Sequence, residues 1–141
     1  MFPDKFQVDP TYTKENGVWV LDLKNVLLPR YFHIKEMNII YVPPGQTLGN
    51  HRHPRTEIFV GIGDNLELSW ITKDRKVKHE PMHPDKSKIM LWKVPPFLPH
   101  AIRNTSATQF ALLVEYANSS QSGVEEIKVI KSEPEQFVES D

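Results

Sequence analysis

The sequence contains no cysteine, which excludes disulfide scaffolds, thiolate zinc sites, iron–sulfur clusters and cysteine nucleophiles. It also lacks an apolar run of about 18 residues, the length that a membrane-spanning helix requires. Neither sign of charge is in excess, because 17 basic and 18 acidic side chains give a net charge of -1. This balance provides no electrostatic attraction for nucleic acid or anionic lipid, so we expect neither nucleic acid nor a membrane as a partner.

The N-terminus lacks the basic start and apolar stretch of a secretory signal, so we expect a cytoplasmic protein. The 141 residues are 39% hydrophobic and 25% charged, which is an ordinary composition for a folded protein. A chain of this length is typical of one domain, and we therefore expect residues 1–141 to form a single domain.

Short apolar stretches punctuated by twelve prolines and six glycines predict an all-β fold. The expected strands cover residues 18–23, 37–42, 57–62, 66–72, 88–94, 109–117 and 124–131. An acidic tail at 132–141 follows, which we expect to fray or to form a short helix. So many short strands in a small protein indicate a sandwich or a closed barrel, including the jelly-roll type.

Four side chains could bind one metal ion. His51 and His53 are two residues apart, and on a strand both would project from the same face. Glu57 follows with the same parity, and His100 could reach the ion from another strand. Three imidazoles and one carboxylate would leave coordination positions open, as a catalytic site requires. The alternative is that these histidines are ordinary core or surface residues that form hydrogen bonds.

Two motifs resemble those of the cupin family. The first is Gly45-Gln-Thr-Leu-Gly-Asn-His51-Arg-His53-Pro-Arg-Thr-Glu57, which Gly63 closes one residue earlier than the family pattern does. The second is Pro95-Pro-Phe97-Leu-Pro-His100-Ala-Ile-Arg-Asn104. Two glycines of the second family motif are replaced, by Ile89 and by Phe97. We expect Phe97 to alter the turn that precedes His100.

The resemblance implies a single cupin jelly-roll β-barrel with its core at residues 37–117, an N-terminal strand at 18–23 and a C-terminal strand and tail at 124–141. It implies one divalent transition metal ion (Fe, Mn, Zn or Ni). The implied ligands are His51, His53, Glu57 and His100. It further implies a homodimer and a small-molecule ligand.

A second histidine pattern does not indicate a metalloprotease. His79-Glu80-Pro81-Met82-His83 matches the signature of zinc metalloproteases, but that signature functions only on a helix. Pro81 would break such a helix at a cost of about 3 kcal/mol. We therefore predict a loop over residues 78–86 with solvated histidines.

Other side chains are weaker candidates. Arg55 lies in the step between two expected ligands, and we interpret it as a surface arginine at the barrel mouth. Tyr41, Trp70 and Trp92 could line a sugar-sized cavity, although aromatic residues at strand spacing more often belong to the core. The sequence reveals no general base outside the ligand set.

The leading functional hypothesis is an isomerase or epimerase that acts on a sugar or another hydroxy-carbonyl compound. The segment Gly49-Asn50-His51-Arg-His53 also resembles cupin domains of sugar-modifying enzymes in polysaccharide synthesis. Two alternatives use the same residues. With Fe(II) the open positions would suit a mononuclear non-haem dioxygenase, and without chemistry the barrel would be a small-ligand-binding protein.

Overall fold

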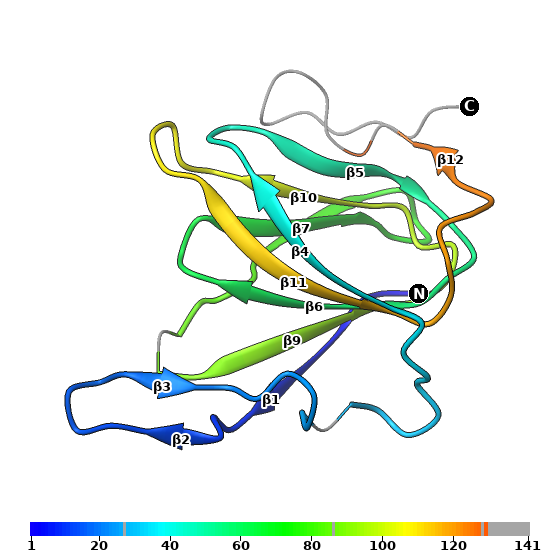
Figure 1. Cartoon of the computed structure of the whole chain (residues 1–141). Coiled ribbons are helices and arrows are strands. Elements are labelled where there is room, and N and C mark those ends of the chain that lie inside the picture. The colour runs from blue at the N-terminus through cyan, green and yellow to red at the C-terminus, as the bar shows by residue number, and fades with distance from the viewer. Residues whose placement is uncertain (27, 86, 128, 130–141) are drawn as a thin grey trace.

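The computed structural model describes residues 1–26, 28–85, 87–127 and 129. All regular elements in this part of the chain are β-strands (Figure 1). The N-terminal strands are β1 (Asp4–Val8), β2 (Tyr12–Thr13) and β3 (Trp19–Val20). They are followed by β4 (Glu36–Val42), β5 (Thr47–Arg52), β6 (Glu57–Ile62), β7 (Leu66–Ile71), β8 (Val77–Pro81), β9 (Ile89–Val94), β10 (His100–Asn104), β11 (Ala111–Ala117) and β12 (Glu125–Glu126).

Two five-stranded antiparallel sheets form the barrel. The first has the strand order β1-β9-β6-β11-β4 and the second has the order β12-β5-β10-β7-β8. Because chain neighbours such as β5 and β6 lie in different sheets, the chain crosses repeatedly from one sheet to the other. The fold is therefore the predicted all-β cupin jelly-roll barrel. The β2–β3 hairpin extends from it as an arm (Figure 1).

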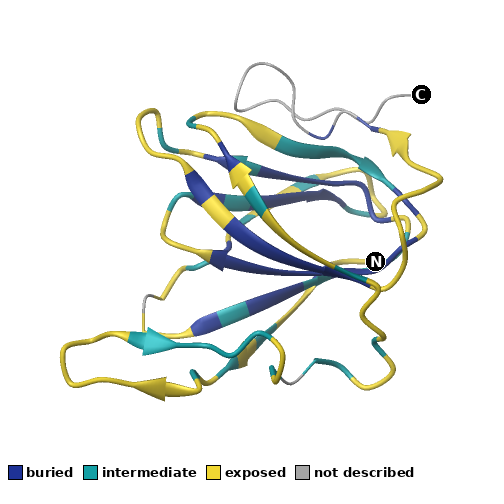
Figure 2. Ribbon diagram, in the orientation of Figure 1, coloured by how far each residue is buried: buried dark blue, intermediate teal, exposed yellow. Residues whose placement is uncertain are grey.

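The barrel interior is filled by side chains that alternate along the strands, as the sequence predicted. Leu66, Leu68 and Trp70 of β7 point inward and pack against Trp92 and Val94 of β9. The central strands are accordingly the most buried part of the molecule (Figure 2). Both tryptophans belong to this core.

The outer face of the first sheet carries a second apolar cluster. Ile58, Val114 and Tyr116 are buried there beneath partly buried side chains of the N-terminal segment, including Leu23. The Tyr116 hydroxyl donates a hydrogen bond of 2.7 Å to the Leu23 carbonyl. The N-terminal segment thus covers a sheet face that would otherwise be apolar and exposed.

The strand predictions are largely confirmed, with β6 at the predicted bounds and β4, β7, β9 and β11 within two residues of them. The predicted strand at 18–23 is wrong in extent, because only Trp19–Val20 pairs. The loop predicted over 78–86 is also wrong at its start, where β8 extends to Pro81. Pro81 is tolerated because β8 is an edge strand, where a missing backbone N–H is harmless.

Part of the C-terminal prediction lies outside the described residues. Of the strand expected at 124–131, Glu125–Glu126 forms β12, whereas residues 128, 130 and 131 are not described, nor is the tail at 132–141. No helix among the described residues is long and apolar enough to cross a bilayer.

Candidate metal site

The four predicted ligands come together. His51 lies on β5 opposite His100, the first residue of β10, and Glu57 begins β6. His53 lies in the short loop between β5 and β6. One donor atom from each side chain lies within 4.8 Å of the other three. Two ligands on opposite sides of one ion are about 4.2 Å apart, so this spacing is close to what a single ion requires.

Gly49 allows the two histidine-bearing strands to approach. It adopts a φ of +100°, and a Cβ atom there would lie 3.0 Å from the His100 carbonyl oxygen. The ladder between β5 and β10 shifts register next to His100. A glycine with left-handed φ is the residue that such an irregular, close crossing needs.

Phe97 replaces the glycine of the second motif but keeps a glycine-like backbone, with φ at +65°. Its N–H donates a 2.8 Å hydrogen bond to the His53 carbonyl, which connects the β9–β10 turn to the loop that carries this predicted ligand. The substitution therefore leaves His100 within the ligand cluster.

We expect Phe97→Gly to be more stable than Phe97→Ala by about 1 kcal/mol, the reverse of the usual order of these two residues. Both variants remove the ring, which is 55% exposed, so they differ mainly in the cost of a Cβ at this φ. Urea denaturation of the two variants measures the difference. An alanine variant as stable as the glycine variant would show that the backbone is unstrained.

Several donor atoms of the cluster lack hydrogen-bond partners among the described residues. They are Nδ1 and Nε2 of His53 and Oε1 of Glu57. The His53 Nε2–Glu57 Oε1 contact measures 2.8 Å but does not have hydrogen-bond geometry. Buried polar atoms without partners cost about 1–3 kcal/mol each, and a cation placed among them would satisfy them together. The residues present therefore fit a divalent ion.

The orientation of the His100 ring also suits metal binding. His100 Nδ1 lies 2.7 Å from the Leu98 carbonyl, which can only accept, so Nδ1 carries the proton. In the neutral ring, Nε2 of His100 would then present a lone pair to the cluster, and this atom lies 3.3 Å from Glu57 Oε1. A backbone carbonyl that fixes the tautomer of a histidine is a usual partner of metal ligands.

The electrostatics keep two of the predicted ligands, His51 and Glu57, in the forms that bind metal. Burial, with the neighbouring imidazoles of His100 and His53, lowers the pKa of His51 to about 4. Burial would raise the pKa of the Glu57 carboxyl, but polar contacts with His100 and His53 together outweigh it and hold that pKa well below its usual range. Neutral imidazole and ionised carboxylate are the forms that bind metal ions.

Arg55 is not the surface residue that the sequence suggested, because only 7% of it is exposed. Its guanidinium contacts Glu57 at 3.0 Å, Glu36 at 3.1 Å and Glu115 at 3.4 Å. It therefore neutralises a buried acidic cluster and holds Glu57 by the oxygen that does not face the imidazoles. The planar guanidinium, with five donors, suits this role.

Glu115 is a site residue that sequence reasoning missed. It lies on the inward face of β11, where it accepts a 2.9 Å hydrogen bond from the Asn38 amide and is 4% exposed. Burial and the nearby Glu57 carboxylate raise its pKa to about 8, so at neutral pH it is mainly protonated. The signal available in the sequence was one acidic residue within an otherwise apolar strand.

The raised pKa predicts how the metal-free protein responds to pH. Folding favours protonated Glu115, so its stabilising contribution is complete below pH 4.5 and is lost as pH rises to about 8. Glu115→Gln resembles the protonated acid and should gain stability relative to the wild type over this range. Urea denaturation with a chelator at pH 5 and pH 8 measures both proteins, and a constant difference between them would contradict the assignment.

A cavity of about 140 Å³ adjoins the cluster inside the barrel. It is lined by His51, Glu57, His100, Arg55 and Glu115, together with apolar residues such as Phe59. Tyr41, a sequence candidate for this lining, is instead 59% exposed on the outer face. The cavity thus places a carboxylic acid, Glu115, beside the predicted ligands, where the sequence had indicated no acid or base.

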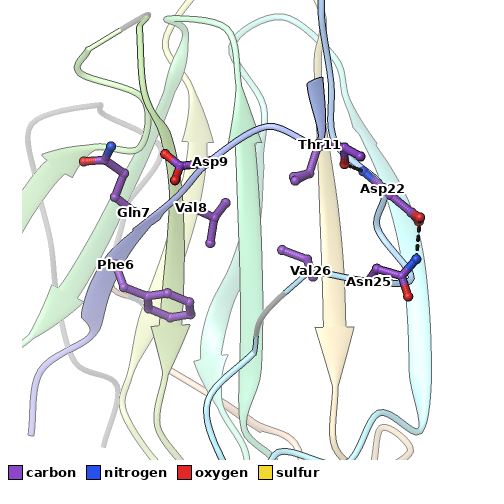
Figure 3. Close-up of a pocket in the computed structure, with 9 residues that line it drawn as sticks. Phe6, Gln7, Val8, Asp9, Thr11, Asp22, Asn25 and Val26 are labelled. Atoms are coloured by element: carbon purple, nitrogen blue, oxygen red, sulfur yellow. Dashed lines mark hydrogen bonds between the residues drawn. The ribbon is translucent and has the colours of Figure 1, made fainter. Parts of the chain in front are cut away.

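A larger hollow of about 530 Å³ lies elsewhere, between β1 and the segment around Asp22 (Figure 3). Among the groups that line it, Asn25 donates to Asp22 at 2.6 Å and the Asp22 N–H donates to Thr11 at 2.7 Å. Because three of the four clustered donor residues line the smaller cavity inside the barrel, we place the functional site there.

No protein family and no curated protein matches this sequence. Solved structures do match. A mutant of the 3,4-ketoisomerase QdtA from Thermoanaerobacterium thermosaccharolyticum, in complex with TDP-4-keto-6-deoxyglucose, has a TM-score of 0.64 at 14% identity, over 86% of this chain and 83% of its own. A 3,4-ketoisomerase from Helicobacter canadensis has a TM-score of 0.64 at 17% identity, over 87% of each chain.

A part of a larger protein matches as well. The capsular polysaccharide assembling protein CapF from Staphylococcus aureus has a TM-score of 0.54 at 18% identity, over 74% of this chain and 28% of its own. Identities this low establish a common fold. The chain therefore shares the fold of these proteins, the cupin-type barrel.

Proposed function

We propose that this protein binds a divalent transition metal ion through His51, His53, Glu57 and His100 and isomerises a small hydroxy-carbonyl compound of the sugar class. The observation that carries the proposal is the convergence of these donors, three of whose buried atoms lack partners among the described residues. The cavity beside them gives a bound molecule room to reach the same ion.

The shared fold supports the substrate class. The matching structures include sugar 3,4-ketoisomerases, one of them in complex with TDP-4-keto-6-deoxyglucose. A cavity of about 140 Å³ is smaller than the range of about 300–1,000 Å³ that drug-sized ligands occupy. It would therefore admit a molecule of a few carbons, or only the sugar end of a larger one.

The residues of the site have different roles in the proposed reaction. When bound, a divalent ion would supply Lewis-acid polarisation of a substrate carbonyl. Glu115 lines the cavity, and its carboxyl group is suited to give and accept the proton that moves between neighbouring carbons during isomerisation. Arg55 holds Glu57 and Glu115 in place, and the apolar cavity wall excludes water from the reacting end.

Nuclear magnetic resonance of candidate substrates in D₂O tests the proposal. Small hydroxy-carbonyl compounds and TDP-4-keto-6-deoxyglucose are incubated with metal-loaded protein, and we expect interconversion with deuterium entering at the carbon next to the carbonyl. His51→Ala should abolish metal binding and turnover together. Full activity in that variant would refute the proposal, and oxygen consumption with Fe(II) instead of isomerisation would favour the dioxygenase alternative.

A further inference from the structure

The segment at residues 118–124 crosses from the first sheet to the second, between β11 and β12, at one end of the barrel (Figure 1). Near its start, the Thr56 N–H donates a 2.9 Å hydrogen bond to the Asn118 side chain, and Arg55 donates one of 3.3 Å to the Ser119 carbonyl. At its far end, β12 pairs with the histidine-bearing strand β5. The segment is therefore attached at both ends to the stretch of chain that carries predicted ligands.

Gln121 lies in the middle of this segment and lines the cavity of about 140 Å³ inside the barrel. The same residue is exposed to solvent, so it lies where the cavity opens. No described residue forms a hydrogen bond with the Gln121 amide. The amide is therefore available both to donate and to accept hydrogen bonds when a molecule enters the cavity.

The other polar side chains of the cavity already have partners or a role. Three of them are predicted metal ligands. Arg55 and Glu115 contact each other at 3.4 Å, and Glu115 also accepts a 2.9 Å hydrogen bond from Asn38. The rest of the described wall consists of Gly49 and the apolar residues Ile40, Leu48, Phe59 and Ile102. Among these lining residues, Gln121 is thus the one neutral side chain that can form hydrogen bonds.

We propose that Gln121 determines specificity by forming a hydrogen bond with a hydroxyl group of the bound substrate. This inference rests on the proposed function, because it assigns a partner to the substrate within the same site. A sugar-class compound carries hydroxyl groups besides its carbonyl, and each needs a partner when it leaves water. The apolar wall offers none, whereas the Gln121 amide does. A site that binds a hydroxyl in this way discriminates against the analogue that lacks it.

A matched pair of ligands tests the inference without requiring turnover. Dihydroxyacetone and hydroxyacetone are small hydroxy-carbonyl compounds that differ by one hydroxyl group. Their dissociation constants for the Zn²⁺-loaded protein are measured by following protein amide resonances during titration. The wild type should bind dihydroxyacetone about tenfold more tightly than hydroxyacetone, as one hydrogen bond allows. In Gln121→Leu, which keeps a side chain of similar size without the amide, this ratio should fall close to one.

Gln7→Leu is the matched control, because Gln7 is an exposed glutamine of β1 that does not line this cavity. This variant should keep the wild-type ratio. Both variants should bind Zn²⁺ as the wild type does, since neither glutamine is a predicted ligand.

Several results would overturn the inference. They are a wild type without a preference between the two compounds, a preference that persists in Gln121→Leu, and one that is also lost in Gln7→Leu. A loss of Zn²⁺ affinity in Gln121→Leu would overturn it as well, because the residue would then support the metal site instead. A Zn²⁺-loaded wild type that binds neither compound would do the same, whereas turnover in D₂O decides the proposed function separately.

Discussion

Replacing Arg55 with alanine is expected to lower the free energy of unfolding by about 3–5 kcal/mol, the usual cost of removing one partner from a buried ion cluster. The variant would leave the ionised Glu57 carboxylate buried without its cation, beside Glu115 and Glu36. A loss of this size is a large part of the stability of a small protein. Urea denaturation at pH 7 measures it.

Arg52→Ala is the control for Arg55→Ala. Arg52 makes two hydrogen bonds of 2.9 Å to Glu125, but this pair lies at the surface, with 33% and 57% of the side chains exposed. Exposed pairs contribute about 0–1 kcal/mol. Equal losses in the two variants would mean that burial of Arg55 has no energetic consequence, contrary to our account of the site.

The second large effect concerns metal affinity. His53→Ala should weaken binding of Zn²⁺ or Mn²⁺ by more than 100-fold, since altering even a residue behind the ligands typically costs 10–100-fold. His53 is 1% exposed and neither of its ring nitrogens has a hydrogen-bond partner within the described residues. Isothermal titration calorimetry provides the affinities.

His79→Ala controls for nonspecific binding by histidine. The His79 ring lies on β8, two strands away from β10, and its Nδ1 is 2.9 Å from the Ser69 hydroxyl. Ser69 pairs with Ala101 rather than with His100, so alternation along the strands places His79 on the opposite face of the sheet from the ligand cluster. The affinity of this variant should equal that of the wild type. A comparable loss in both histidine variants would place metal binding somewhere other than the proposed site.

The clustering of the four predicted ligands could be expected from the sequence, because the spacing of the motif residues tolerates local irregularity of the backbone. The two-residue spacing predicts His51 and His53 on one strand, yet His53 lies beyond the end of β5. The two imidazoles still meet, with ring centroids 4.7 Å apart. A two-residue spacing therefore identified two histidines that lie close together, although only one of them is on the expected strand.

The surroundings of the ligands were not predictable, because they depend on strand pairing between distant segments. Glu115 becomes a neighbour of Glu57 only because β11 pairs with β6, with Glu57 opposite Ala117. Arg55 is buried only because Glu36 on β4 and Glu115 on β11 converge on it. The local sequence pattern predicts the strands and the side chains that point inward. Which polar residues become neighbours depends instead on the order of the strands in each sheet.

Anomalous diffraction from a crystal soaked in Zn²⁺ and measured at the zinc edge tests the central claim most directly. The account predicts one dominant peak per chain, coordinated by His51, His53, Glu57 and His100 at about 2.0–2.2 Å. A crystal with no peak among these side chains, whose imidazoles instead hydrogen-bond to water, would contradict it.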